Sequence, residues 1–170
     1  AVDQGVVVVA SSGNDCDKGN ISTPSCGSKV IAVGATYDAA LGSQSSSCCT
    51  DATTMADQVT CFSNASSQLD HVAPGAVITT ALGSGSGTSL AAPHTSGLAA
   101  LILHKKSNLT PFQVRDYINF NTDPIAGGTG GGSGRINARK ALNAAPVVPG
   151  DGVCSPQAAL DCGLDGNPDG

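Results

Sequence analysis

The stretch that decides the fold is GTSLAAPHTSGLAALIL, residues 87 to 103, in which a glycine and a Thr-Ser pair precede a long apolar run. The stretch contains no Asp, Glu, Lys or Arg, and its sides are apolar or small. It therefore predicts a helix that is buried in the middle of the fold. Ser89 would lie in the first turn of that helix, where free backbone N–H groups favour developing negative charge. This position suits a nucleophile, although a serine or threonine there more often only caps the helix.

Two β-branched runs upstream of that helix indicate a layered α/β fold. GVVVVA (5–10) and VIAVGA (30–35) have the continuous apolar pattern of fully buried parallel strands. The glycine-rich residues 127–134 follow no predicted strand and lack the spacing of a phosphate loop, so we interpret them as a turn. The remaining predicted elements are two short strands in 69–80 broken at Pro74-Gly75, a helix with a capping box over 110–121, and a closing helix over 137–145.

Length and composition limit the classes of protein to which this chain can belong. The 170 residues suffice for one domain, and with 12% charged residues and a net charge of -5 the chain has no basic surface for nucleic acid or a membrane. No uncharged apolar run approaches the roughly 20 residues that cross a bilayer. The opening AVDQGVVVVA has the pattern of a helix end leading into a strand, so we expect the N-terminal part of the fold to lie outside this sequence. The Pro-, Gly- and Asp-rich residues 146–170 are interpreted as a linker or the start of a further module.

The seven cysteines favour disulfides and therefore an oxidising compartment. A zinc site is the alternative, but the sequence has no C-x-x-C pair, and its histidines are poorly spaced for a tetrahedral site. An odd number leaves one thiol free or paired outside this chain. The Ser-, Thr- and Cys-rich residues 41–61 lack apolar periodicity, which indicates a surface insertion held by disulfides.

The stretch 87–103 resembles the serine motif of the subtilisin-like serine proteases, G-T-S-x-A-x-P-H followed by small residues and an apolar helix. This resemblance covers residues 1–145 and implies a three-layer α/β fold with a mostly parallel central sheet, here incomplete at its N-terminus. It also implies a serine endopeptidase that acts on proteins or peptides. Further segments resemble the family in its order: VVVVASSGN (6–14), VIAVGAT (30–36), FSNASSQLDHVAPG (62–75) and GRINARKAL (134–142).

The resemblance assigns roles to five residues. Ser89 would be the nucleophile, and Asn14 would donate its side-chain amide to the oxyanion together with the backbone N–H of Ser89. Ser11, Ser12 and Gly13 would form a wall of the pocket for the residue that precedes the scissile bond. A turn asparagine after Gly13 is the plainer interpretation of Asn14.

The general base is the missing part of this constellation. In the family the base histidine and its orienting aspartate precede the strand with which this sequence begins, and neither motif is present. His94 belongs to the serine motif as a packing or hydrogen-bonding residue, while His71 and His104 occur in no catalytic context. We therefore expect this chain to carry the nucleophile and oxyanion hole without the base, to be inactive alone, and to aggregate in isolation.

Two other classes of protein compete with this interpretation. An α/β-hydrolase would need an acid and then a histidine downstream of its serine, and no histidine follows His104. A pseudo-protease or secreted binding module of the same fold would differ only in lacking the Asp and His motifs outside this sequence. The expected location is extracellular, and the expected partners are protein or peptide substrates and the missing part of the domain.

Departures from the family pattern concern ions, oxidation and disulfides. Asp70 matches a position that in some relatives binds calcium with backbone carbonyls near residues 28–30; a solvent-facing aspartate is the favoured alternative. Residues 165–170 match the first half of an EF-hand-like loop, so calcium is a candidate structural ion, although no metal ligand is assigned and no cofactor is required. Leu90 follows the serine where many relatives have an oxidisable methionine. Cys16 and Cys26 are expected to pair locally, although spacing does not settle the connectivity.

Overall fold

The computed structural model describes residues 1–81, 83–126 and 130–144. The boundary at 145/146, the stretch 146–170 with its last two cysteines, and the EF-hand-like residues lie outside the described part. Residues 127–129 of the predicted turn also lie outside it. Within the described residues, no helix is long and apolar enough to cross a membrane.

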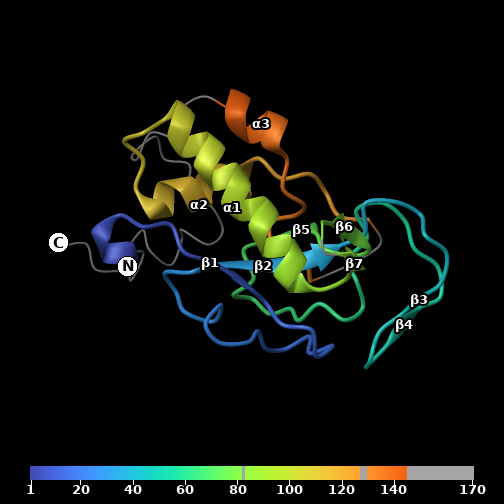
Figure 1. The fold of residues 1–170 in the computed structure, drawn as a ribbon. Helices are drawn as coiled ribbons and strands as arrows, with labels where there is room; N and C mark the ends of the chain where they lie inside the picture. The colour runs from blue at the N-terminus through green and yellow to red at the C-terminus, as the bar shows by residue number, and fades with distance from the viewer. Residues whose placement is uncertain (82, 127–129, 145–170) are drawn as a thin grey trace, which may run out of the picture.

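A parallel three-stranded sheet forms the centre of the structure (Figure 1). Its order is β1 (Val9–Ser11), β2 (Ile31–Thr36) and β5 (His71–Pro74), and both pairs of neighbouring strands are parallel. Every residue of β2 is buried, as its apolar run predicts. This parallel sheet with helices above it confirms the α/β class.

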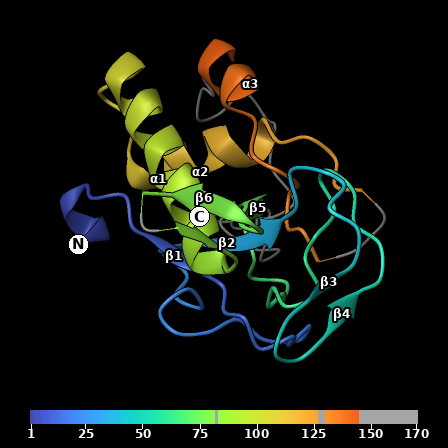
Figure 2. The ribbon, with the colours of Figure 1, turned by 45° about the vertical axis from the view of Figure 1, so that its right-hand side comes forward.

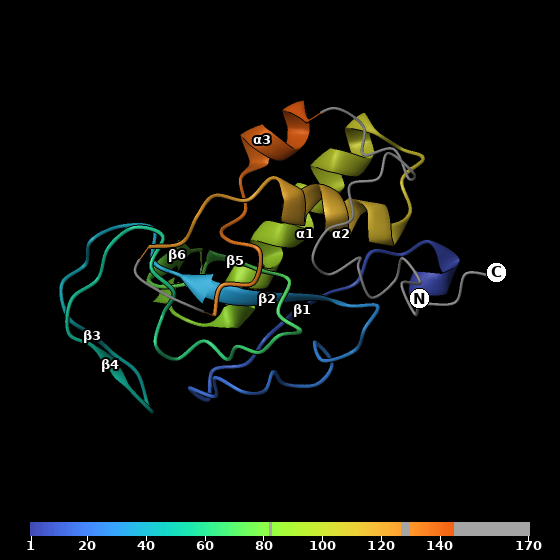
Figure 3. The ribbon, with the colours of Figure 1, turned by 180° about the vertical axis from the view of Figure 1, so that it is seen from behind.

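Three helices lie on one side of the sheet, and the long loops lie on the other side (Figures 1 and 3). They are α1 (Thr88–Lys105), α2 (Pro111–Phe120) and α3 (Ala138–Asn143). α1 packs against all three strands of the sheet and against both other helices. Thr110 and Gln113 form the predicted capping box of α2. The main core cluster contains residues of β2, β5 and all three helices.

Smaller elements surround this centre (Figure 2). The second of the two strands predicted in 69–80 is β6 (Ile78–Thr80), and β7 (Gly83–Gly85), which was not predicted, pairs with it antiparallel. The insertion over residues 41–61 contains a short antiparallel pair, β3 (Gln44–Ser45) and β4 (Thr50–Asp51). A 3-10 helix, η1 (Val2–Gln4), precedes β1.

Two expectations about burial were wrong. The first strand begins only at Val9 and lies at the sheet edge, and Val6, which was expected inside, is 51% exposed. α1 is not buried on all sides, because Leu101 is also 51% exposed, and Pro93 and Gly97 share that exposed face. An apolar pattern shows that a segment can be buried, but not that neighbouring elements cover it. In the described residues, other elements cover only one side of α1 and one edge of β1.

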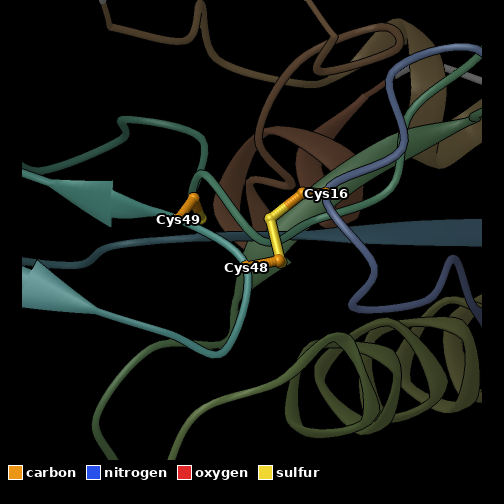
Figure 4. Close-up of side chains that lie close together, drawn as sticks. All are labelled: Cys16, Cys48 and Cys49. Atoms are coloured by element: carbon orange, nitrogen blue, oxygen red, sulfur yellow. A yellow bond between two sulfur atoms is a disulfide. The ribbon is translucent and has the colours of Figure 1, made fainter.

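One of the two disulfides connects the insertion to the rest of the fold, and the other lies within the insertion. Cys16 bonds Cys48, and Cys49 bonds Cys61, so the expected Cys16–Cys26 pair was wrong. Cys26 has a free, exposed thiol. Figure 4 shows the Cys16–Cys48 bond with Cys49 close beside it. The insertion folds back onto the loop after β1, a long-range contact that spacing along the chain does not reveal.

Candidate active site

The N-terminus of α1 meets the loop after β1 at the carboxyl ends of the parallel strands, where open α/β sheets place their binding sites. The Gly87 N–H donates to the carbonyl of Gly75, which directly follows β5, at 2.7 Å. Ser89 lies one residue into the helix and is exposed, while Thr88 is fully buried. The helix start is therefore anchored to the sheet while the Ser89 hydroxyl faces outward.

The side chain of Asn14 is held in one orientation by Thr88. Asn14 Oδ1 accepts hydrogen bonds from the backbone N–H of Thr88 at 2.8 Å and from its hydroxyl at 3.0 Å. The two bonds engage the amide oxygen and leave the Nδ2 protons for another acceptor. Thr88 is a site residue that sequence reasoning considered only as a helix cap.

The Ser89 hydroxyl and the Asn14 amide face one small space. A Cβ added to Gly87 would lie 3.2 Å from Ser89 Oγ and 3.6 Å from Asn14 Nδ2. Glycine at this position keeps that space open. A negatively charged oxygen located there would be within reach of the Asn14 amide and of the Ser89 backbone N–H in the first turn of α1.

The loop that carries Asn14 is organised by Asn64, which sequence reasoning missed. Asn64 Oδ1 accepts from the backbone N–H groups of Asp15 at 2.8 Å and Asp17 at 3.1 Å, and its Nδ2 donates to Asp15 Oδ2 at 3.0 Å. The Asn64 backbone also bonds Gly13 and the Ser12 hydroxyl. Asn64 is only 3% exposed. Nothing in the sequence distinguishes it from an ordinary turn asparagine.

The three residues expected to line a substrate pocket are placed differently from one another. Ser11 ends β1 and is half-buried, and Gly13 is half-buried with a φ of 107°. Ser12 is fully buried, and its hydroxyl donates to the Asn64 carbonyl at 2.9 Å. Its side chain is therefore turned into the protein. Its backbone is also bonded within the protein, because the Ser12 N–H donates to the Val33 carbonyl at 2.9 Å and the Ser12 carbonyl accepts from the Ser22 N–H at 2.8 Å.

The bonds of Asn64 allow a stability prediction. The Asn64→Ala variant is expected to lower the free energy of unfolding by about 3 kcal/mol, because it removes three part-buried hydrogen bonds and leaves the backbone N–H groups of Asp15 and Asp17 without these partners. Asn20→Ala is the matched control in the same loop: Asn20 is exposed, and we expect a change of about 0.5 kcal/mol or less. Urea denaturation of the two variants tests this, and equal losses would contradict the organising role of Asn64.

None of the three histidines of the chain is arranged as a base for Ser89. His71 is fully buried, its ring nitrogens bond Asn119 Oδ1 at 2.7 Å and Thr95 Oγ1 at 3.0 Å, and burial lowers its pKa. His94 Nδ1 bonds the carbonyl of Leu90 at 2.9 Å. His104 lies 15 residues beyond Ser89 on α1, which is about 22 Å along a helix.

Asp70 is neither the solvent-facing residue favoured above nor an open calcium ligand. It is 7% exposed; Oδ2 accepts from the Ala32 N–H at 2.8 Å, and Oδ1 accepts from Asn119 Nδ2 at 3.2 Å. Arg115 Nε lies 3.9 Å from Oδ1, and Arg115 Nη1 donates to the carbonyl of Ser28 at 3.1 Å. A guanidinium thus already bridges the expected ligands, so these residues do not fit a calcium ion in this arrangement.

Comparisons with known proteins agree with this fold. A protease of Pseudoalteromonas arctica superposes with a TM-score of 0.66 at 25% identity, over 82% of this chain and 43% of that chain. Fervidolysin of Fervidobacterium pennivorans, described as a keratinolytic enzyme related to subtilisin, superposes with a TM-score of 0.64 at 25% identity, over 85% of this chain and 23% of that chain. The fold is therefore that of the subtilisin-like proteases.

Sequence comparison identifies the family. The model of the Subtilase family matches residues 1–142, and subtilisin of Bacillus pumilus is 36% identical over 149 residues. An extracellular protease of Xanthomonas campestris is 32% identical over 160 residues, which cover 85% of this chain and 25% of that protein. The chain belongs to the subtilase family of serine peptidases. It spans about half the length of the B. pumilus relative, 48%, while 83% of this chain is matched.

Proposed function

We propose that this chain is part of a serine endopeptidase that hydrolyses peptide bonds through an acyl-enzyme on Ser89. The observation that carries the proposal is the space shared by Ser89 Oγ and Asn14 Nδ2, with Asn14 oriented by Thr88. Family membership supports the same reaction. No cofactor enters the mechanism.

In the proposed reaction a base takes the proton of Ser89 Oγ as the oxygen attacks the scissile carbonyl carbon. The carbonyl oxygen becomes negatively charged and accepts hydrogen bonds from Asn14 Nδ2 and the Ser89 backbone N–H. A neutral amide suits this role, because it stabilises charge that exists only in the transition state and competes for no proton. The protonated base then gives its proton to the leaving amine, and water hydrolyses the acyl-enzyme by the same route.

The base and its orienting carboxylate are proposed to come from a segment of the domain outside this chain. The placements of His71, His94 and His104 support this, because each is bonded elsewhere or distant from Ser89. The exposed apolar face of α1, at Pro93, Gly97 and Leu101, would pack against that segment. We expect the chain alone to be inactive and prone to aggregation, with residues 1–145 forming the C-terminal part of the peptidase domain.

We propose an extracellular location and protein or peptide substrates. The two disulfides fit an oxidising compartment, and one relative is described as an extracellular protease. Residues 146–170 are proposed to be a linker or the beginning of another module.

Fluorophosphonate labelling of the complete protein tests the proposed function. Labelling confined to the peptide that contains Ser89, and absent in Ser89→Ala, is the expected result, because only a serine activated by a base reacts readily with this probe. Folded protein that takes up no label would instead be a pseudo-protease that keeps this fold for binding.

Leu90 gives the proposed enzyme an expected resistance to oxidation. The half-buried Leu90 directly follows the nucleophile and cannot form a sulfoxide. We expect activity to survive peroxide, while Leu90→Met should make it peroxide-sensitive. Met55→Leu is the control, since it removes the sole methionine, which lies in the insertion and is 51% exposed. Rapid loss of wild-type activity traced to modification near Ser89 would refute this expectation.

A further inference from the structure

A cavity of about 300 Å³ lies beside Asn14, on the side of the insertion. Two aromatic residues contribute to its lining, the buried Tyr37 and Phe62, and the other lining residues are polar or small. No lining residue is charged. The complete lining is Asn14, Tyr37, Gln44, Ser45, Ser46, Ser47, Cys61, Phe62 and Ser86.

The insertion forms one wall of this cavity, and the wall is covalently fixed to the loop of Asn14. The Cys16–Cys48 bond joins the insertion to a residue two positions after Asn14, and Cys48 Sγ lies 3.6 Å from the Asn14 carbonyl oxygen. The Cys49–Cys61 bond lies within the insertion and joins its middle to its last residue, which directly precedes Phe62. A wall fixed in this way is ordered before a ligand arrives, which lowers the entropy cost of binding.

The half-buried carboxylate of Asp51 strengthens the same attachment. Asp51 of β4 accepts from the Tyr37 hydroxyl at 2.8 Å and from the Cys61 N–H at 2.9 Å, both at Oδ2. Burial first, and then the hydrogen bond with Asp51, raise the pKa of Tyr37, so this hydroxyl remains a donor to Asp51. The Tyr37 side chain of the lining is therefore hydrogen-bonded to the insertion through Asp51.

Asn14 lines the cavity, whereas none of the residues expected to hold the substrate before the scissile bond, 11–13, does so. Because the Asn14 amide marks the carbonyl under attack, a substrate strand that passes it places its preceding and following residues on opposite sides. The cavity is thus positioned for the leaving-group side.

We propose that the disulfide-anchored insertion selects the substrate residue that follows the scissile bond, and that it favours neutral side chains with an apolar stem and a hydrogen-bonding end, glutamine foremost. This proposal rests on the proposed function. Tyr37 and Phe62 would contact the stem. Gln44 donates one amide proton to the Leu41 carbonyl at 3.1 Å, and its side-chain oxygen would accept a hydrogen bond from the substrate. A charged side chain would be desolvated here without a counter-ion in the lining.

The test uses the complete protein and peptides that differ only in the residue after the scissile bond: Gln, Leu, Glu or Lys. We expect kcat/KM to be about tenfold higher for Gln than for Glu. Gln44→Glu should raise the Lys-to-Glu ratio of kcat/KM about tenfold, and Gln44→Lys should lower it by a similar factor. Ser43→Ala, an exposed neighbour outside the lining, should leave every ratio unchanged.

A second variant tests the covalent anchoring. Replacing Cys16 and Cys48 together by serine is expected to reduce the Gln-to-Glu preference, whereas replacing the free Cys26 should not. Cleavage with equal rates for all four peptides, or Gln44→Glu with wild-type ratios, would overturn the role of the insertion alone. If no peptide is cleaved and Ser89 takes up no fluorophosphonate, the proposed function has failed and this proposal falls with it.

Discussion

Ser89→Ala is expected to lower the kcat of the complete protein by about a millionfold, because the variant has no atom that can form the acyl-enzyme. This magnitude was established on a subtilisin, a relative of this chain. The residual rate would come from the oxyanion site and substrate binding, which the variant retains. Progress curves with a peptide ester or amide measure the loss directly.

Ser96→Ala is the matched control for this loss. Ser96 also lies on α1 and is exposed, and its hydroxyl donates to the Ala92 carbonyl at 3.2 Å, so it has no access to the proposed site. Its kcat should remain within about twofold of wild type, which is the change expected of a surface substitution. A Ser89→Ala variant with substantial activity would mean that another group is the nucleophile.

Asn14→Leu is expected to lower kcat by about 10²- to 10³-fold with little change in KM, the effect of removing one oxyanion donor. This range too was established on a subtilisin. The reason in this structure is the free Nδ2 of Asn14 beside Ser89 Oγ. Leucine keeps the approximate volume of asparagine but donates no hydrogen bond.

The Thr88→Val variant tests how much the orientation of the Asn14 side chain contributes to kcat, because it leaves the Asn14 amide donor in place. Valine removes the hydroxyl that binds Asn14 Oδ1 at 3.0 Å, while the backbone N–H bond at 2.8 Å remains. We expect a smaller loss of kcat, of about tenfold, because one of the two orienting bonds is kept.

The outcome that would contradict the role of Asn14 concerns the Asn14→Leu variant. If its loss appeared entirely in KM, Asn14 would bind the substrate in the ground state rather than stabilise the transition state.

Local patterns predicted the central elements of the fold because those elements depend mainly on neighbouring residues. β2 follows from a single β-branched run, and α2 follows from Thr110 and Gln113, which cap it within one turn. The shared space beside Ser89 and Asn14 depends on positions 75 residues apart, and it was expected only through the resemblance to the family. Their joint position now supports roles that remain to be tested by experiment.

Apart from the local pairing of β7 with β6, the main features that sequence reasoning missed are tertiary. Cys16 pairs with Cys48 rather than with Cys26, because the insertion returns to the loop after β1. Asn64 holds that loop through bonds that span about 50 positions along the chain. Asp70 is buried against Arg115 of α2. Apolar periodicity and residue spacing carry no information about such contacts.

The most direct test of the account is to observe the acyl-enzyme itself. The complete protein is mixed with a peptide ester, quenched in acid within the first turnover, and analysed by intact-mass and peptide-mapping mass spectrometry. The account predicts an adduct with the mass of the acyl group on the peptide that contains Ser89, and its absence in Ser89→Ala. Turnover without a covalent adduct, or an adduct on any other residue, would contradict it.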